Sequence, residues 1–149
     1  MTVISELSVR RAAYINESPD VVWREFETRE RLAAWFGTGH TLEIYEPQLH
    51  GRVELSVEID GEKRGFGGNI IVFEPHRELT FTDNWYGEMA WPVPMLITIR
   101  LAPLYAGTLV ELFHHGFEQL GANAGAEYES YEAGWDNHHL VALRQIVES

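Results

Sequence analysis

The segment ANAGAEYESYEAGWDNHHLVALRQIVE, residues 122–148, decides the fold, because it has helical periodicity in a chain that otherwise reads mostly as strands. At about 3.6 residues per turn, its large side chains fall on one stripe. The stripe consists of Ala124, Tyr128, Tyr131, Trp135, His139, Leu140, Ala142, Leu143, Ile146 and Val147. Its N-terminal half is aromatic with polar tips, and its C-terminal half is aliphatic. We therefore expect one long helix that packs a core with its second half and lines a cavity with its first.

The residues before this helix predict one strand, two short helices and about six antiparallel strands. The first strand covers residues 8–16, and the helices begin at Pro19 and Arg29. From His40 the period changes to two, most clearly over residues 52–59, which are followed by the hairpin signal Asp60-Gly61. A sheet with one apolar face must be covered, and only the last helix is long enough. The expected fold is α+β, with a curved antiparallel sheet of six to seven strands wrapped around the C-terminal helix.

Composition narrows the class of protein before any motif is considered. The 149 residues, 45% of them hydrophobic, predict one folded domain over residues 1–149. No apolar run approaches the ~20 residues of a membrane helix, and the N-terminus lacks the pattern of a secretory signal. The absence of cysteine fits a cytoplasmic protein. The formal charge of −12 argues against a nucleic-acid partner. It reflects either solubility, the favoured interpretation, or attraction to a basic protein surface.

Several motifs in the same order resemble a known superfamily. They are SPDVVW at 18–23, LAAWF at 32–36, EPHRELTFT at 74–82, GTLVELFHHGF at 107–117, and Gly134-Trp135 followed by Leu140 and Leu143. Together they resemble the SRPBCC (START-like, helix-grip) superfamily, and within it the group similar to the C-terminal domain of the activator of Hsp90 ATPase. The resemblance implies a cavity between the long helix and the concave sheet. It supplies no catalytic motif, because members bind lipids and hormones, cyclise polyketides or have no known activity.

Aromatic residues supply most of the candidate ligand contacts. The loop Asp83–Pro94 is rich in them, and its aromatics form a pocket rim or a plug, with a subunit contact as a third possibility. On the helix, the buried phenols would orient a ligand or bond the backbone, and Trp135 is favoured as a core residue. The predicted ligand-binding set is Trp35, Phe36, Phe81, Trp85, Trp91, Met95, His114, Tyr128, Tyr131, Trp135 and His139.

Histidines and one carboxylate are the candidates for acid–base chemistry. Strand alternation turns His114 inward with Val110 and Leu112, and turns His115 outward. Asp83 shares the parity of Phe81 and would face the cavity mouth, where burial would make it a base. The alternatives are a hydrogen-bonded core histidine and a solvated carboxylate. No histidine pair has the spacing of a helical zinc motif, so we expect no metal and no cofactor.

These patterns favour a cytoplasmic protein that holds a small hydrophobic or aromatic molecule without established catalysis. The first alternative is a protein-interaction domain similar to the Hsp90 activator, with a chaperone or other protein as partner. The second is a cyclase- or hydrolase-type enzyme that uses His114, Asp83 or a tyrosine. The sequence leaves open whether the protein is a monomer or a homodimer.

Overall fold

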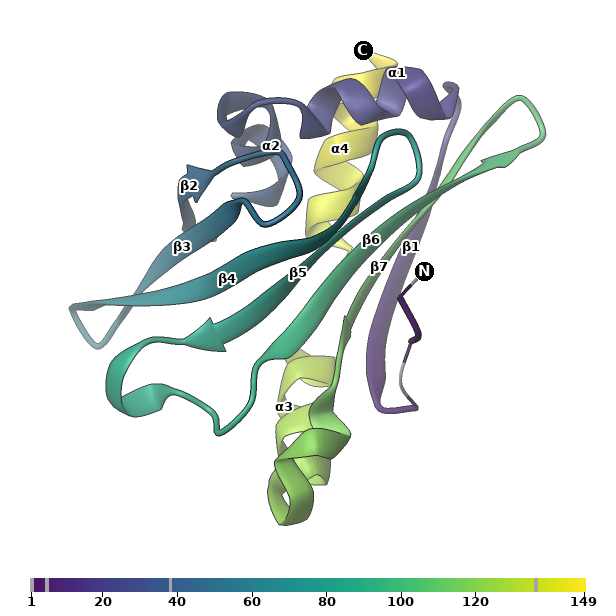
Figure 1. The fold of residues 1–149 in the computed structure, drawn as a ribbon. Helices are drawn as coiled ribbons and strands as arrows, with labels where there is room; N and C mark the ends of the chain where they lie inside the picture. The colour runs from purple at the N-terminus through teal and green to yellow at the C-terminus, as the bar shows by residue number, and fades with distance from the viewer. Residues whose placement is uncertain (1, 5, 38, 136) are drawn as a thin grey trace.

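In the computed structural model, which describes residues 2–4, 6–37, 39–135 and 137–149, seven strands form one antiparallel sheet (Figure 1). Asp136, in the segment predicted as one long helix, and Thr38, just before the strands predicted from His40, lie outside the described residues. The strands are β1 (Ser8–Ile15), β2 (Thr41–Tyr45), β3 (Arg52–Ile59), β4 (Glu62–Glu74), β5 (Glu78–Trp85), β6 (Met95–Leu104) and β7 (Gly107–His115). Their order in the sheet is β1-β7-β6-β5-β4-β3-β2, so the first strand returns to pair with the last. The α+β helix-grip fold expected from the sequence is confirmed.

The helices gather at the concave face and the ends of this sheet (Figure 1). They are α1 (Pro19–Trp23), α2 (Arg29–Phe36), α3 (Ala124–Gly134) and α4 (His138–Glu148), with short 3-10 turns at η1 (Arg24–Phe26), η2 (Gly87–Met89) and η3 (Phe117–Asn123). Leu140 and Leu143 of α4 are buried in the main core, together with Trp35 of α2 and Phe81 of β5. The aliphatic half of the predicted stripe therefore packs the core.

Glycine allows two neighbouring strands of the sheet to approach closely. In the long strand β4, a β-carbon on Gly68 would lie 2.1 Å from the Thr82 hydroxyl oxygen and 2.4 Å from the Thr82 carbonyl oxygen on β5. Only glycine permits the two backbones to come so close. The strands β4 and β5 also shift register between Ile70 and Val72, which adds to the local twist.

The C-terminal helical segment is divided, and this corrects the expectation of one continuous helix. The helix α3 ends at Gly134, and Trp135 is extended, with φ −78° and ψ 136°. Arg11 on β1 donates to the carbonyl oxygens of Glu132 and Trp135, at 2.9 and 2.8 Å. Carbonyl groups at a helix end lack partners within the helix, so the guanidinium stabilises the break. The sequence pattern missed it because the cause lies on a distant strand.

His115 points outward from the concave face, as alternation predicts, but it is buried there. Its side chain does lie on the face opposite His114, but it is only 1% exposed and its Nε2 lies 3.0 Å from the Thr98 hydroxyl. The N-terminal segment covers this outer face, where Thr2 contacts Thr80 and accepts a hydrogen bond from Arg100. Burial lowers the pKa of His115 to about 4. Alternation therefore identified the face of the sheet, but not that another segment covers it.

Candidate functional site

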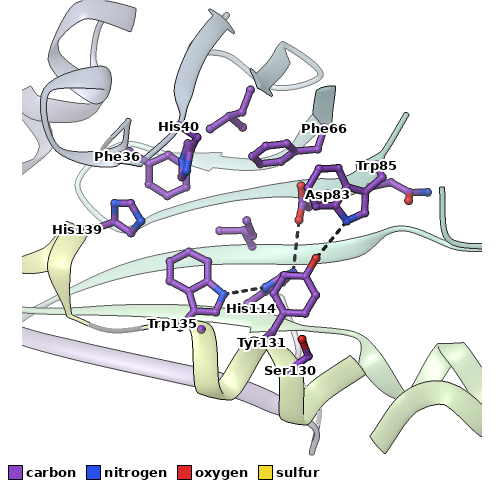
Figure 2. A pocket seen from close by; sticks show the side chains of 14 residues that line it. Phe36, His40, Phe66, Asp83, Trp85, His114, Ser130, Tyr131, Trp135 and His139 are labelled. Carbon is purple, nitrogen blue, oxygen red and sulfur yellow. Dashed lines mark hydrogen bonds and ion pairs between the residues drawn. The ribbon is translucent and has the colours of Figure 1, made fainter. Parts of the chain in front are cut away.

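A pocket of about 350 Å³ lies between the concave face of the sheet and the helices α3 and α4 (Figure 2). Its lining comes from α2, the strands β3 to β7 and the two C-terminal helices, with one residue from the segment before β2. The lining residues are Phe36, His40, Leu55, Phe66, Asp83, Asn84, Trp85, Ile97, His114, Ser130, Tyr131, Gly134, Trp135 and His139. Ser130 and Gly134 are exposed on α3, so the pocket opens beside this helix.

Aromatic rings form most of the pocket wall. The ring centroids of Phe66 and Trp85 lie 5.0 Å apart at the β4–β5 side of the pocket. Across the pocket, the rings of Phe36 and His139 stack with centroids 5.5 Å apart. Rings in such contacts are held in place by their neighbours, so this wall is pre-formed.

The side chains of Trp135, His114 and Asp83 link the break between α3 and α4 to the strands through polar contacts. The Trp135 indole N–H donates to His114 Nδ1 at 3.1 Å, and His114 Nε2 lies 3.4 Å from Asp83 Oδ2. An indole nitrogen can only donate, so Nδ1 of His114 is an acceptor and carries no proton. The ring proton of His114 is therefore on Nε2, facing the Asp83 carboxylate. The side chains of His114 and Asp83 are nearly inaccessible to solvent, at 1% and 5% exposure.

A second polar contact crosses the pocket between α3 and β5. The Trp85 indole N–H donates to the Tyr131 hydroxyl oxygen at 3.2 Å. Burial is the main reason that the pKa of Tyr131 rises to about 12, so this phenol is neutral at physiological pH. Its own O–H hydrogen is available as a donor, because the contact with Trp85 uses the oxygen as an acceptor.

His40 and His139 lie at another part of the lining, beside Phe36. His139 Nδ1 lies 3.2 Å from the Trp35 carbonyl oxygen, which can only accept, so Nδ1 carries the proton. Burial and the neighbouring His139 lower the pKa of His40. His40 is therefore uncharged at neutral pH.

The structure brings seven of the sequence candidates together and places five elsewhere. Those in the lining are Phe36, Asp83, Trp85, His114, Tyr131, Trp135 and His139. Trp35 and Phe81 are buried in the main core instead. Met95, Trp91 and Tyr128 belong to a second cluster around Phe117, below the pocket lining.

Seven lining residues were not among the candidates. Leu55 and Ile97 are inward-facing positions of clear strands, so alternation alone would have found them. The others are His40, Phe66, Asn84, Ser130 and Gly134. His40 and Phe66 come together through a ring contact of 5.7 Å between segments far apart in the chain, and no local pattern signals this.

The described residues contain no group of three or more His, Asp or Glu side chains arranged to hold a metal ion. Within the same residues, no helix combines the length and apolarity needed to cross a membrane.

Comparison with known proteins identifies a family whose model matches most of the chain. The family described as "Activator of Hsp90 ATPase homolog 1-like protein" matches residues 16–148. No curated protein matches the chain. Among solved structures, protein CV1439 from Chromobacterium violaceum is similar at 23% identity and a TM-score of 0.73, over 97% of this chain and 99% of that one.

Two other structures share the fold. Protein NE0264 from Nitrosomonas europaea has 17% identity and a TM-score of 0.72, over 99% of this chain and 98% of that one. The Aha1 dimer from Colwellia psychrerythraea has 15% identity and a TM-score of 0.60, over 95% and 96%. Identities this low show a shared fold and nothing more specific.

Proposed function

Since the chain belongs to the activator of Hsp90 ATPase homolog 1-like family, whose fold holds a pocket here, we propose that it binds a small, largely apolar molecule between the sheet and the C-terminal helices. About 350 Å³ lies at the lower end of the usual range for small-molecule sites. This volume suits a ligand with one or two rings.

One observation carries the proposal. Among the described residues, three buried side-chain atoms have no hydrogen-bond partner, namely His40 Nε2, Asp83 Oδ1 and His114 Nε2. All three belong to residues that line this one pocket. Buried polar groups in proteins are nearly always paired, because an unpaired one costs about 1–3 kcal/mol. A ligand with a polar group would supply a partner for those of the three atoms that it reaches, while its rings pack against the aromatic wall.

Indole is a suitable first probe, because it combines an aromatic body with one N–H donor for Asp83. We expect saturable binding of indole by isothermal titration calorimetry. Ser130→Trp places a large ring at the pocket opening and should weaken binding at least about ten-fold. Glu129→Trp is the matched control, since residue 129 is exposed on the same helix and does not line the pocket. Equal affinity of the two variants, or no binding to the unaltered protein, would contradict the proposal.

Native mass spectrometry of the freshly purified protein tests the same idea without a chosen probe. A non-covalent adduct that disappears on denaturation would give the mass of the natural ligand. The adduct should be depleted in Ser130→Trp and retained in Glu129→Trp. The same spectrum reports whether the protein is a monomer or a dimer.

Two other functions stay predictions. The 3.4 Å contact of His114 with Asp83 is the convergence of two groups that acid–base catalysis requires, so an enzyme using the same pocket is the main alternative. A chaperone or other protein partner would follow from the family description, and the acidic charge of −12 would favour a basic surface on it.

A further inference from the structure

The charge inside the pocket identifies the class of ligand. We infer that the proposed ligand is an organic cation, an ammonium group carried on an aromatic or apolar body, with the ammonium beside Asp83. This inference rests on the proposed function, because it specifies the molecule that the same pocket binds. Four features of the described residues support it in turn.

The first feature is a buried carboxylate without a Lys or Arg partner. Asp83 is 5% exposed, and in the described part of the chain no Lys or Arg nitrogen lies within 4.0 Å of it. The arginines and the lysine that form ion pairs all contact other carboxylates, such as Arg100 with Glu78 at 2.9 Å. Asp83 Oδ2 instead lies 3.4 Å from His114 Nε2.

The second feature is the way in which His114 faces Asp83. Trp135 donates to His114 Nδ1, so this nitrogen is the acceptor in the contact. The ring therefore presents an N–H group, on Nε2, to the carboxylate at 3.4 Å. The Asp83 carboxylate therefore faces an N–H dipole, whereas a salt bridge requires a full positive charge. Removing such a carboxylate from water without a counter-charge is costly, so a cation that enters the pocket restores the balance.

The third feature is the aromatic surroundings of the carboxylate. Figure 2 shows Phe66, Trp85 and Tyr131 around Asp83, with Trp135 across the pocket. The negative faces of aromatic rings attract ammonium groups, and aromatic cages with a nearby carboxylate are a known solution for binding them. The Tyr131 phenol is neutral at physiological pH and therefore does not duplicate the charge of Asp83.

The fourth feature is the position of the other titratable groups. His40 and His139 lie with Phe36 on the opposite side of the pocket from Asp83 and Trp85 (Figure 2). His40 is neutral at physiological pH, because burial lowers its pKa. The rings at this end can contact the body of the ligand, and His40 and His139 lie away from the ammonium. The net charge of −12 also raises the local concentration of cations around the protein.

A matched pair of probes tests the charge separately from the shape. 2-Phenylethylamine is protonated at pH 7.5, whereas 2-phenylethanol has the same body and a neutral hydroxyl donor. By calorimetry, we expect the amine to bind at least about ten-fold more tightly than the alcohol. Asp83→Asn should abolish this preference while retaining binding of the alcohol. Asp20→Asn, which changes a surface carboxylate, should leave it intact.

The outcomes separate the two proposals. If the alcohol and the amine bind equally to the unaltered protein, the cation inference is overturned and the proposed function stands. If neither they nor indole bind, the proposed function itself fails. If Asp83→Asn does not fold, as judged by circular dichroism, the probe preference in the unaltered protein decides.

Discussion

Replacing Arg11 by Met should destabilise the protein far more than the same change at Arg10, its neighbour on β1. The Arg11 side chain is 19% exposed and donates to two carbonyl oxygens at the break between α3 and α4. Arg10 is 52% exposed and contacts Glu111 across the β1–β7 pair at 2.8 Å. Methionine keeps most of the aliphatic stem, so each substitution removes chiefly the guanidinium.

The contacts set the size of the two effects. A hydrogen bond from a charged donor contributes about 1.5–3 kcal/mol, and two bonds from one group add incompletely, so Arg11→Met should cost about 3 kcal/mol. An exposed ion pair contributes about 0–1 kcal/mol, which bounds the loss for Arg10→Met. In a domain of this size, the Arg11 change corresponds to a melting temperature lower by about 6–12 °C.

Urea unfolding of both variants at 25 °C measures the difference directly. The midpoint should fall in Arg11→Met while the slope of the free energy against urea is preserved, since the folded and unfolded states are otherwise unchanged. Hydrogen exchange should accelerate in α3, whose last turn Arg11 holds, and indole binding should weaken with it. Losses within about 0.5 kcal/mol of each other in the two variants would refute the argument that Arg11 anchors the helix break.

Two further predictions concern the sheet. Gly68→Ala should destabilise the protein, because the added β-carbon would lie 2.1 Å from the Thr82 hydroxyl oxygen. The control Gly125→Ala in α3 has open space around it and should be neutral or stabilising by up to about 1 kcal/mol. Thermal denaturation of both variants tests this, and equal losses of stability would show that small shifts relieve the close approach at Gly68. The pKa of His115 is about 4 in the folded protein and near 6.5 in an unfolded chain. Between these values the unfolded chain binds more protons, so the His115 contribution to stability is complete above pH 6.5 and is lost as the pH falls toward 4. His115→Gln should reduce the loss of stability between pH 7 and pH 5, measured by urea unfolding, and an unchanged loss would mean that other groups cause it.

Local patterns predict most of the fold. Alternation over β3 and the Asp60-Gly61 turn after it depend only on neighbouring residues, and Asp60 and Gly61 indeed have φ of 53° and 79°. The predicted strand over residues 52–59 coincides with β3. Such features follow from the pleat and from the backbone freedom of turn residues, so the sequence expresses them directly.

Contacts between distant segments explain what the sequence did not predict. His115 is buried because the N-terminal segment crosses the outer face of the sheet, and alternation along β7 contains no information about that segment. His40 reaches the pocket from the segment before β2 and meets Phe66 on β4. The same limit applies to Trp35 and Phe81, which have the chemistry of ligand contacts but are enclosed by the core.

The interruption of the helix and the arrangement of the pocket meet at one residue, Trp135. The stripe from Tyr128 to Ile146 is fully compatible with a continuous helix, yet Trp135 is extended. At this position its carbonyl oxygen accepts from Arg11 and its indole N–H reaches His114. The second contact makes Nδ1 of His114 an acceptor and turns Nε2 of the ring toward Asp83, at 3.4 Å.

A chain of contacts therefore connects β1 to the interior of the site. A sequence that departs from its local preference usually does so where another constraint is stronger, and functional sites are the common place for it. Here the departure occurs at the residue whose indole N–H contacts His114, the neighbour of Asp83. Changes that favour helical geometry at Trp135 should remove this contact, and calorimetry with the amine and the alcohol should then show a weaker preference for the amine.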